Sequence, residues 1–359
     1  MSAAAPPPPR IGLSKSRVLI LAVVEVAVLA LIVFRVMPQV GSYSAAADAL
    51  RTMSVPALLL IAAAVVGYLL WYGLPFVAAA PGLGYAHAQQ LNQAAFAIGN
   101  GVPGGGAFGL GVQYAMFASW GYPAVQAAAA IAAIGVWSLF VTLGLPVLGV
   151  LALVVSGRAA GPYVLGAGLG LVALVVLVVG FALVMRSEAA ARRVGAWGDA
   201  LVARLPQRVR DRVPSLSVAV VHFRTGIAEL VRRRWAAITA TQVGVSLAQF
   251  VVLYLALRGL EGWPAAGTPL LVVFGGFAVS QLGLLVPVTP GGLGTVDAAM
   301  VALLVAFGTM PGVATAAALV WRASSFIPQI VAGVVALALW TRSANRLAAG
   351  RPAAAPTTR

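Results

Sequence analysis

The sequence contains no cysteine and little charge, and these absences exclude several kinds of chemistry. Without cysteine there is no disulfide and no thiolate to act as a nucleophile or a metal ligand. The two histidines, His87 and His222, lie too far apart in the sequence to indicate a metal site. Charged residues make up 9% of the 359 positions, against about 25% in an average soluble domain. No Walker-A, His-Glu-x-x-His or nucleophile-elbow sequence occurs, so we expect neither a cofactor nor a bound metal.

Apolar residues, by contrast, make up 61% of the chain. Several runs reach or exceed the roughly 20 residues that a helix needs to cross a bilayer. The clear candidate spans are residues 18–37, 55–80, 123–155, 161–185, 236–258 and 312–340. The first run is long for a signal peptide and more spans follow it, so we interpret it as a retained helix. The composition therefore predicts an all-α polytopic membrane protein.

Two further apolar regions, 84–120 and 268–309, are interrupted by glycine and proline, and each is expected to form two half-helices joined by a loop. Both contain a Pro-Gly-Gly element, at Pro103 in the first region and at Pro290 in the second. Each element is followed by a second proline and an alanine-rich helix with a tryptophan, at offsets of 187 and 188 residues. This spacing indicates an internal repeat. The alternative is chance recurrence in a chain with 40 glycines and 22 prolines.

The basic residues, 22 arginines and one lysine, flank the apolar runs. That pattern is typical of topology signals and headgroup contacts, not of nucleic-acid binding. The stretch 186–235 holds eleven arginines against four acidic residues, so the positive-inside rule places it in the cytoplasm, together with both basic ends of the chain. Six spans satisfy these constraints if both broken regions re-enter the membrane from one side. Eight spans satisfy them if 268–309 crosses twice and 84–120 does not. In the six-span arrangement the halves have opposite orientations, as in transporters with inverted repeats.

The second broken region has residues suited to unwound backbone within a membrane. Proline lacks a backbone N–H and glycine allows positive φ; the residues concerned are Pro287, Pro290, Gly291, Gly292 and Gly294. Asp297 follows in the first turn of the next predicted helix, where a carboxylate complements the helix dipole. Unwound backbone at membrane depth must be buried in protein or line a wet cavity. A surface loop with a capping aspartate is the alternative.

The run Pro287-x-Thr-Pro-Gly-Gly-x-Gly-x-x-Asp297 resembles the hallmark of the flippase-like transmembrane domain of lysylphosphatidylglycerol synthases. A second matching element runs from Arg322 to Pro328 and is followed by Gly333. The resemblance covers about residues 18–340 and implies transfer of a lipid or a lipid-linked group between leaflets. Family members usually carry glutamate at the position of Asp297. Because the chain leaves no room for a soluble synthase domain after its last predicted helix, we expect a transporter and not an enzyme.

Charged residues within spans are costly and usually mark function. Arg322 lies about ten residues into the last predicted helix, and guanidinium matches phosphate geometry, so it is the best candidate for a phosphate contact. A structural salt bridge to Asp297 is the competing interpretation. Glu25, in the middle of the first predicted span, either pairs with an arginine, carries a proton in a transport cycle, or is a neutral hydrogen-bonded side chain.

Polar side chains on the broken regions and the last helix complete the predicted substrate site. They are Asn100, Gln113, Gln281 and Ser325. The other predicted site residues are Arg322, Asp297, Glu25, Pro103 and the proline and glycine residues of the second broken region, which are Pro287, Pro290, Gly291, Gly292 and Gly294. These side chains either line a polar groove through which a headgroup crosses, or satisfy backbone groups freed by the glycine breaks.

The sequence as a whole predicts a flippase-like translocase of the cytoplasmic membrane with six to eight transmembrane helices. The predicted parts are a disordered tail over 1–17, a first repeat over 18–155, a second repeat over 161–340 with the basic loop 186–235, and a disordered tail over 341–359. Its expected partners are membrane lipids that are anionic or carry phosphate, and not nucleic acid. The alternatives are a membrane-embedded enzyme acting on lipid-linked substrates and a non-catalytic scaffold.

Overall fold

The computed structural model describes residues 47–48, 51–101, 105–158, 161–203, 207, 215–262, 267–285 and 290–349. The first predicted span, 18–37, lies outside these residues, and so do Glu25, Pro103 and Pro287. The regular elements of the described part are all helices, as predicted. Four of them are long and apolar enough to cross a membrane: Val55–Ala79, Ala124–Val155, Leu216–Glu261 and Pro311–Ser343.

The first of these spans is interrupted, unlike the continuous span predicted over 55–80. Helix α4 (Val55–Trp71) ends just before Gly73, and α5 (Leu74–Ala79) restarts with Pro75 in its first turn. Proline is well tolerated there because the first N–H groups of a helix have no intrahelical acceptor. The break turns the chain toward the first hairpin.

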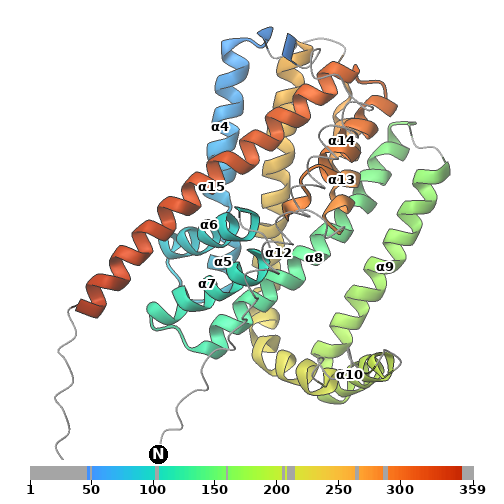
Figure 1. Cartoon of the computed structure of the whole chain (residues 1–359). Helices are drawn as coiled ribbons and strands as arrows, with labels where there is room; N and C mark the ends of the chain where they lie inside the picture. Colours follow the sequence, from blue (N-terminus) through green and yellow to red (C-terminus); the bar gives the residue numbers. More distant parts are fainter. Residues whose placement is uncertain are drawn as a thin grey trace, which may run out of the picture.

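Both regions that were predicted to be broken consist of two short helices, which confirms that part of the prediction. The first contains α6 (Tyr85–Gly101) and α7 (Gly105–Ser119). The second contains α13 (Leu270–Ser280), the 3₁₀ turns η2 (Gln281–Leu285) and η3 (Pro290–Gly292), and α14 (Thr295–Ala306). We call these pairs the first and second hairpins. Figure 1 shows the first hairpin in the lower half of the helix bundle and the second in the upper half.

Three long helices carry the chain between the two ends of the bundle. Helix α8 (Ala124–Val155) and α9 (Gly161–Arg186) run in opposite directions, and α12 (Leu216–Glu261) returns beside them. The last helix, α15 (Pro311–Ala349), crosses the bundle with Pro328 inside it (Figure 1). It extends beyond the predicted 312–340.

The basic segment 186–235, which the sequence predicts to be the connection between two spans, is largely helical in its described part. It holds α10 (Glu188–Val202) and the first part of α12. Hydropathy detects only apolar runs, but charge pairs one turn apart also stabilise helices. Arg192 Nη2 lies 2.5 Å from Glu188 Oε1, and Arg232 and Arg233 both pair with Glu229. We call the end of the bundle that carries these arginines the basic end.

The buried side chains form two main clusters, one around each hairpin. Phe76, Leu91 and Phe117 belong to the cluster around the first hairpin. Phe277 and Met300 belong to the cluster around the second. Large apolar side chains also cover the outside of the bundle, in the manner of a surface that faces lipid.

Candidate functional site

A buried ion pair joins the second hairpin to α15. Arg322 Nε donates to Asp297 Oδ1 at 2.7 Å, and the two side chains are 14% and 10% exposed. The other carboxylate oxygen, Oδ2, accepts a hydrogen bond of 2.8 Å from the backbone N–H of Gly294 and so caps α14. The salt bridge that the sequence offered as the competing interpretation of Arg322 is therefore present. The contact of Arg322 with a phosphate stays a prediction.

The backbone before α14 is unwound, and three glycines take conformations that other residues avoid. The φ angles of Gly291, Gly292 and Gly294 are +60°, +65° and +82°. Thr295 Oγ1 donates to the carbonyl oxygens of Gly283 and Gly292, each at 3.1 Å, and so ties the break to η2. In the described part of the glycine-rich element the backbone is therefore unwound, and Gly292 and Gly294 are buried.

The guanidinium of Arg322 has donors that are only weakly engaged. Nη1 and Nη2 lie 3.4 Å from the carbonyl oxygens of Gly291 and Gly292, at the long limit of a hydrogen bond. The rings of Trp321 and Phe326 lie 4.8 and 4.9 Å from its central carbon. One strong bond to Asp297 and two aromatic faces therefore fix the group, while its outer nitrogens retain capacity for another acceptor.

The two hairpins meet beside this ion pair. A Cβ built on Gly291 of the second hairpin would lie 2.5 Å from Asn100 Oδ1 of the first. Phe96 and Phe326 stack edge to face with 5.3 Å between ring centroids, which joins α6 to α15. A Cβ on Gly333 would overlap the carbonyl oxygen of Gln93. Gly333 therefore permits α15 to lie directly against α6.

A polar cavity of about 260 Å³ lies in the centre of the bundle. Its polar lining comes from α6, α8, α12 and the end of α13, with Tyr72 beside α4. The polar residues that line it are Tyr72, Asn92, Ser138, Thr142, Gln242, Ser246, Gln249 and Gln281. Of these residues, Gln281 was a predicted site residue. The residues of α8 and α12 were missed, although their four- and three-residue spacings place them on one face of each helix.

Hydrogen bonds connect the cavity wall to α15, the helix that carries Arg322. Trp321, the neighbour of Arg322, donates from Nε1 to the carbonyl oxygen of Gln249 at 3.1 Å. Gln249 Nε2 donates to the hydroxyl of Tyr68 at 2.8 Å, and that hydroxyl donates to Gln329 Oε1 at 2.9 Å. A polar network thus runs from the cavity wall to α15 beside Arg322.

The remaining predicted residues have mainly local contacts. Ser325 donates one turn back to the carbonyl oxygen of Trp321 at 2.7 Å, and Asn100 Nδ2 donates to that of Phe96 at 3.0 Å. Gln113 is buried on α7 and is not among the described residues that line the central cavity. Pro290 begins η3. The structure therefore gathers Asn100, the three glycines, Asp297 and Arg322, but not Gln113.

These features define a class: a multi-pass helical membrane protein with two broken hairpins and a buried ion pair at one of the breaks. The chain belongs to the family described as the lysylphosphatidylglycerol synthase TM region, whose model matches residues 18–333. This confirms the resemblance found in the sequence. A search of curated proteins found no match to this chain.

Proposed function

We propose that this protein moves a lipid, or a lipid-linked intermediate, between the leaflets of the cytoplasmic membrane. The observation that carries the proposal is the polar central cavity, which lies in a bundle whose outer surface is apolar. Burying polar side chains within a bilayer is costly unless they serve packing or a path. A lipid headgroup that crosses the membrane needs such a polar lining while its acyl chains stay in lipid.

The arrangement of the hairpins supports the same function. They lie in opposite halves of the bundle (Figure 1), and their broken ends meet where Gly291 faces Asn100. Two repeats of opposite orientation, with both hairpins re-entering the membrane, account for this arrangement. Broken helices that meet near the middle of a membrane protein are the usual location of substrate sites in transporters with inverted repeats.

Arg322 is the proposed phosphate contact in this path. Its bond to Asp297 holds the guanidinium in place, and its long contacts to the carbonyls of Gly291 and Gly292 are readily exchanged for a phosphate oxygen. Guanidinium–phosphate hydrogen bonds are short and charge-assisted, so this exchange is favourable. Asp297 remains bound throughout and prevents the break from unfolding.

The orientation follows from charge. The basic end carries Arg186, Arg192, Arg193 and the three arginines 232–234, and the positive-inside rule places this end in the cytoplasm. The end of α15 lies in the same lower part of the bundle (Figure 1). We therefore place the C-terminus in the cytoplasm, and we retain the same placement for the N-terminus as a prediction.

The test is leaflet exchange of labelled lipids in proteoliposomes. Two probes are used, a labelled phosphatidylglycerol and a labelled polyprenyl phosphate. We compare wild type with Arg322→Lys, which keeps the charge but loses the planar fork, and with Ser246→Leu, which fills the central cavity. Arg322→Lys should slow exchange by about tenfold or more, since a hydrogen bond to a charged group contributes roughly 1.5–3 kcal/mol. Ser246→Leu should also slow exchange, because its side chain takes the space through which the headgroup would pass.

The matched control is Val251→Leu, at a lipid-exposed position on the same helix as Ser246. It should leave the exchange rate unchanged. Size-exclusion profiles establish that each variant is folded. Wild-type exchange no faster than in empty liposomes, with both probes, would refute the proposal.

A further inference from the structure

A second and larger cavity opens between α8, α9 and α12. Its volume is about 990 Å³, at the upper end of the roughly 300–1,000 Å³ typical of small-molecule sites. We call it the lateral cleft. It shares Val141 and Leu145 of α8 with the central cavity but otherwise has its own lining. The ribbons of α8 and α9 lie close where α8 ends and diverge toward the basic end (Figure 1).

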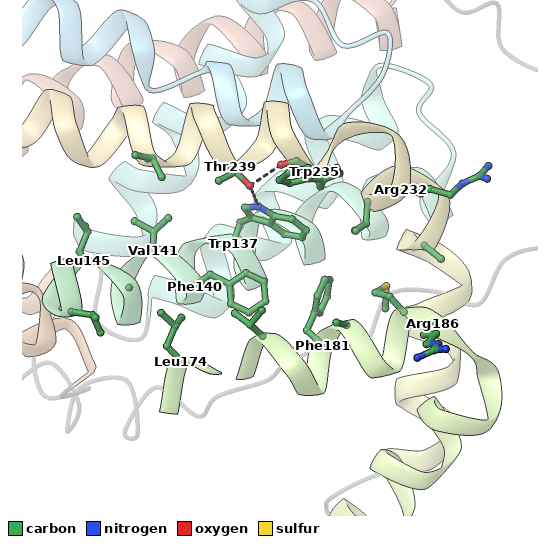
Figure 2. A pocket seen from close by; sticks show the side chains of 18 of the residues that line it. Trp137, Phe140, Val141, Leu145, Leu174, Phe181, Arg186, Arg232, Trp235 and Thr239 are labelled. Atoms are coloured by element: carbon green, nitrogen blue, oxygen red, sulfur yellow. Dashed lines mark hydrogen bonds between the residues drawn. The ribbon is translucent and has the colours of Figure 1, made fainter. Parts of the chain in front are cut away.

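The walls of the lateral cleft are apolar, and aromatic contacts join α8 to α9 there. Trp137, Phe140 and Phe181 contact one another edge to face, with centroid distances of 5.3–5.6 Å. Trp137 is held by a hydrogen bond of 2.7 Å from its Nε1 to Thr239 Oγ1. Figure 2 shows this aromatic group in the middle of the cleft, with Leu145 and Leu174 toward one end. This surface suits hydrocarbon chains.

The other end of the lateral cleft is basic. Arg186 and Arg232 lie there together (Figure 2), and Arg224 also belongs to the lining. The one acidic residue of the lining is Glu229, which already pairs with Arg232 and Arg233. Within the described residues, Arg224 Nε is buried and has no hydrogen-bond partner. The cleft therefore combines an apolar body with an excess of positive charge at the basic end.

The length of the lateral cleft matches one leaflet of a bilayer. Its lining on α9 runs from Leu171 to Arg186, which is roughly 22 Å at 1.5 Å per residue. Half a bilayer, headgroup region included, measures about 20–22 Å. A lipid with its phosphate at the arginines would thus place its acyl chains along the apolar walls.

We propose that the lateral cleft binds an anionic phospholipid of the leaflet at the basic end. Arg224 and Arg186 contact the phosphate, and the aromatic group at Trp137 contacts the acyl chains. An anionic lipid fits better than a zwitterionic one, because the excess positive charge has no other counterion among the cleft residues. The proposal concerns binding only, and it stands whether or not the protein translocates lipid.

The test is direct lipid binding to the purified full-length protein in detergent, measured by native mass spectrometry. Phosphatidylglycerol and phosphatidylcholine with identical acyl chains are the two probes. Wild type should bind phosphatidylglycerol about tenfold more tightly, because both lipids offer a phosphate but only phosphatidylcholine also brings a cationic headgroup against the arginines. The double variant Arg186→Gln with Arg224→Gln should remove this preference, and Val178→Trp should weaken binding of both lipids by filling the cleft.

Two matched variants control for general effects of charge and bulk. Arg193→Gln removes an exposed arginine from α10, and Val179→Trp adds the same bulk at an α9 position outside the cleft lining. Both should bind phosphatidylglycerol as wild type does. Equal binding of the two lipids by wild type would overturn the proposal, and so would a double variant that keeps the preference for phosphatidylglycerol. Loss of transport in the leaflet-exchange assay with intact binding here would refute only the proposed function.

Discussion

The two hairpins carry the same Pro-Gly-Gly element in sequence, yet different forces hold them. The second hairpin is fixed by charge: Arg322 binds Asp297, and Asp297 caps α14. The first hairpin is closed by small residues. A Cβ on Gly105 would overlap the carbonyl oxygen of Ile98, so α6 and α7 approach through backbone.

The polar side chains of the first hairpin form hydrogen bonds between uncharged groups. Gln90 Nε2 donates to the carbonyl oxygen of Ala336 at 3.0 Å, and Gln89 Nε2 donates to that of Leu69 at 2.6 Å. These bonds tie the first hairpin to backbone carbonyls of α15 and α4. The same helix-breaking element therefore occurs in two kinds of hairpin. The first is held by close packing and neutral hydrogen bonds, and the second is held by an ion pair. Of the two, the second offers the phosphate contact that we propose.

The largest expected effect comes from removing one partner of the buried ion pair. Arg322→Met leaves Asp297 charged and buried, and such a loss typically costs about 3–5 kcal/mol. Adding Asp297→Asn should restore most of the stability, because the amide removes the charge and still accepts from Gly294. Unfolding by titration with denaturing detergent measures the difference.

The control for this prediction is Arg192→Met on α10, which removes an exposed pair with Glu188. Exposed pairs contribute about 0–1 kcal/mol. If Arg322→Met is no more destabilising than Arg192→Met, the second hairpin is not held by charge and the contrast between the hairpins fails.

The next effect concerns the neutral packing of the first hairpin. In Gly333→Ala the added Cβ would overlap the Gln93 carbonyl and Ala97, so α15 must move away from α6. Overpacking of this kind costs about 1–3 kcal/mol. Gly99→Ala on α6 is the matched variant, because its Cβ would enter open space. It should stabilise the protein by about 0.5–1 kcal/mol, since alanine favours helix over glycine.

Thermal unfolding in detergent distinguishes the two glycine variants, because Gly333→Ala should lower the unfolding temperature and Gly99→Ala should raise it. Destabilisation by Gly99→Ala as large as that by Gly333→Ala would show that glycine on α6 and α15 serves flexibility and not close packing.

Much of this organisation could be predicted from sequence because helix breakers act locally. The two broken regions and the depth of Arg322 depend on residues close in the chain, and each was predicted. Arg322 and Asp297 are 25 residues apart, so nothing local predicts their contact. Their pairing could be named as an alternative because the chain has only eight acidic residues that could pair with a buried arginine.

The central and lateral cavities could not be predicted in the same way. They depend on how α8, α9 and α12 pack, and the tertiary arrangement decides which face of each helix turns inward. Ser138 and Thr142 are single polar residues in an apolar span, and nothing local indicates that they face Gln242 and Ser246. Helices within the connection 186–235 were not predicted, because they are not continuously apolar; α10 and the start of α12 bury only some of their side chains, such as Ala191 and Ile227.

A smaller effect should reveal whether the two hairpins are coupled where they meet. Gly291→Ala is strained by its φ of +60° and by the nearby Asn100 Oδ1. Asn100→Ala removes that oxygen, so the double variant should be more stable than the sum of the single changes predicts. Coupling of about 0.5 kcal/mol or more is expected for residues in contact. Strict additivity in a double-mutant cycle of unfolding free energies would place the hairpins out of contact.

The smallest expected effect concerns a difference between two aspartates that both cap helices. Asp297 caps α14 inside the bundle, whereas Asp199 on α10 is half-buried and caps α12 by accepting from the N–H groups of Leu216 and Ser217. A hydrogen bond from the Ser217 side chain, with that from the Leu216 N–H, lowers the pKa of Asp199.

Because the pKa of Asp199 is lower in the folded state than in the unfolded one, the cap contributes stability above the ordinary aspartate pKa of about 3.9. That contribution is lost as the pH falls through the lowered folded value. The amides of Leu216 and Ser217 should therefore lose protection from hydrogen exchange, normalised to intrinsic rates, below about pH 4. Asp199→Asn should show no such change in this range, because its amide does not titrate. Equal pH dependence in wild type and Asp199→Asn would mean that the start of α12 is held by packing against α10, and that Asp297 alone is a capping carboxylate whose charge matters.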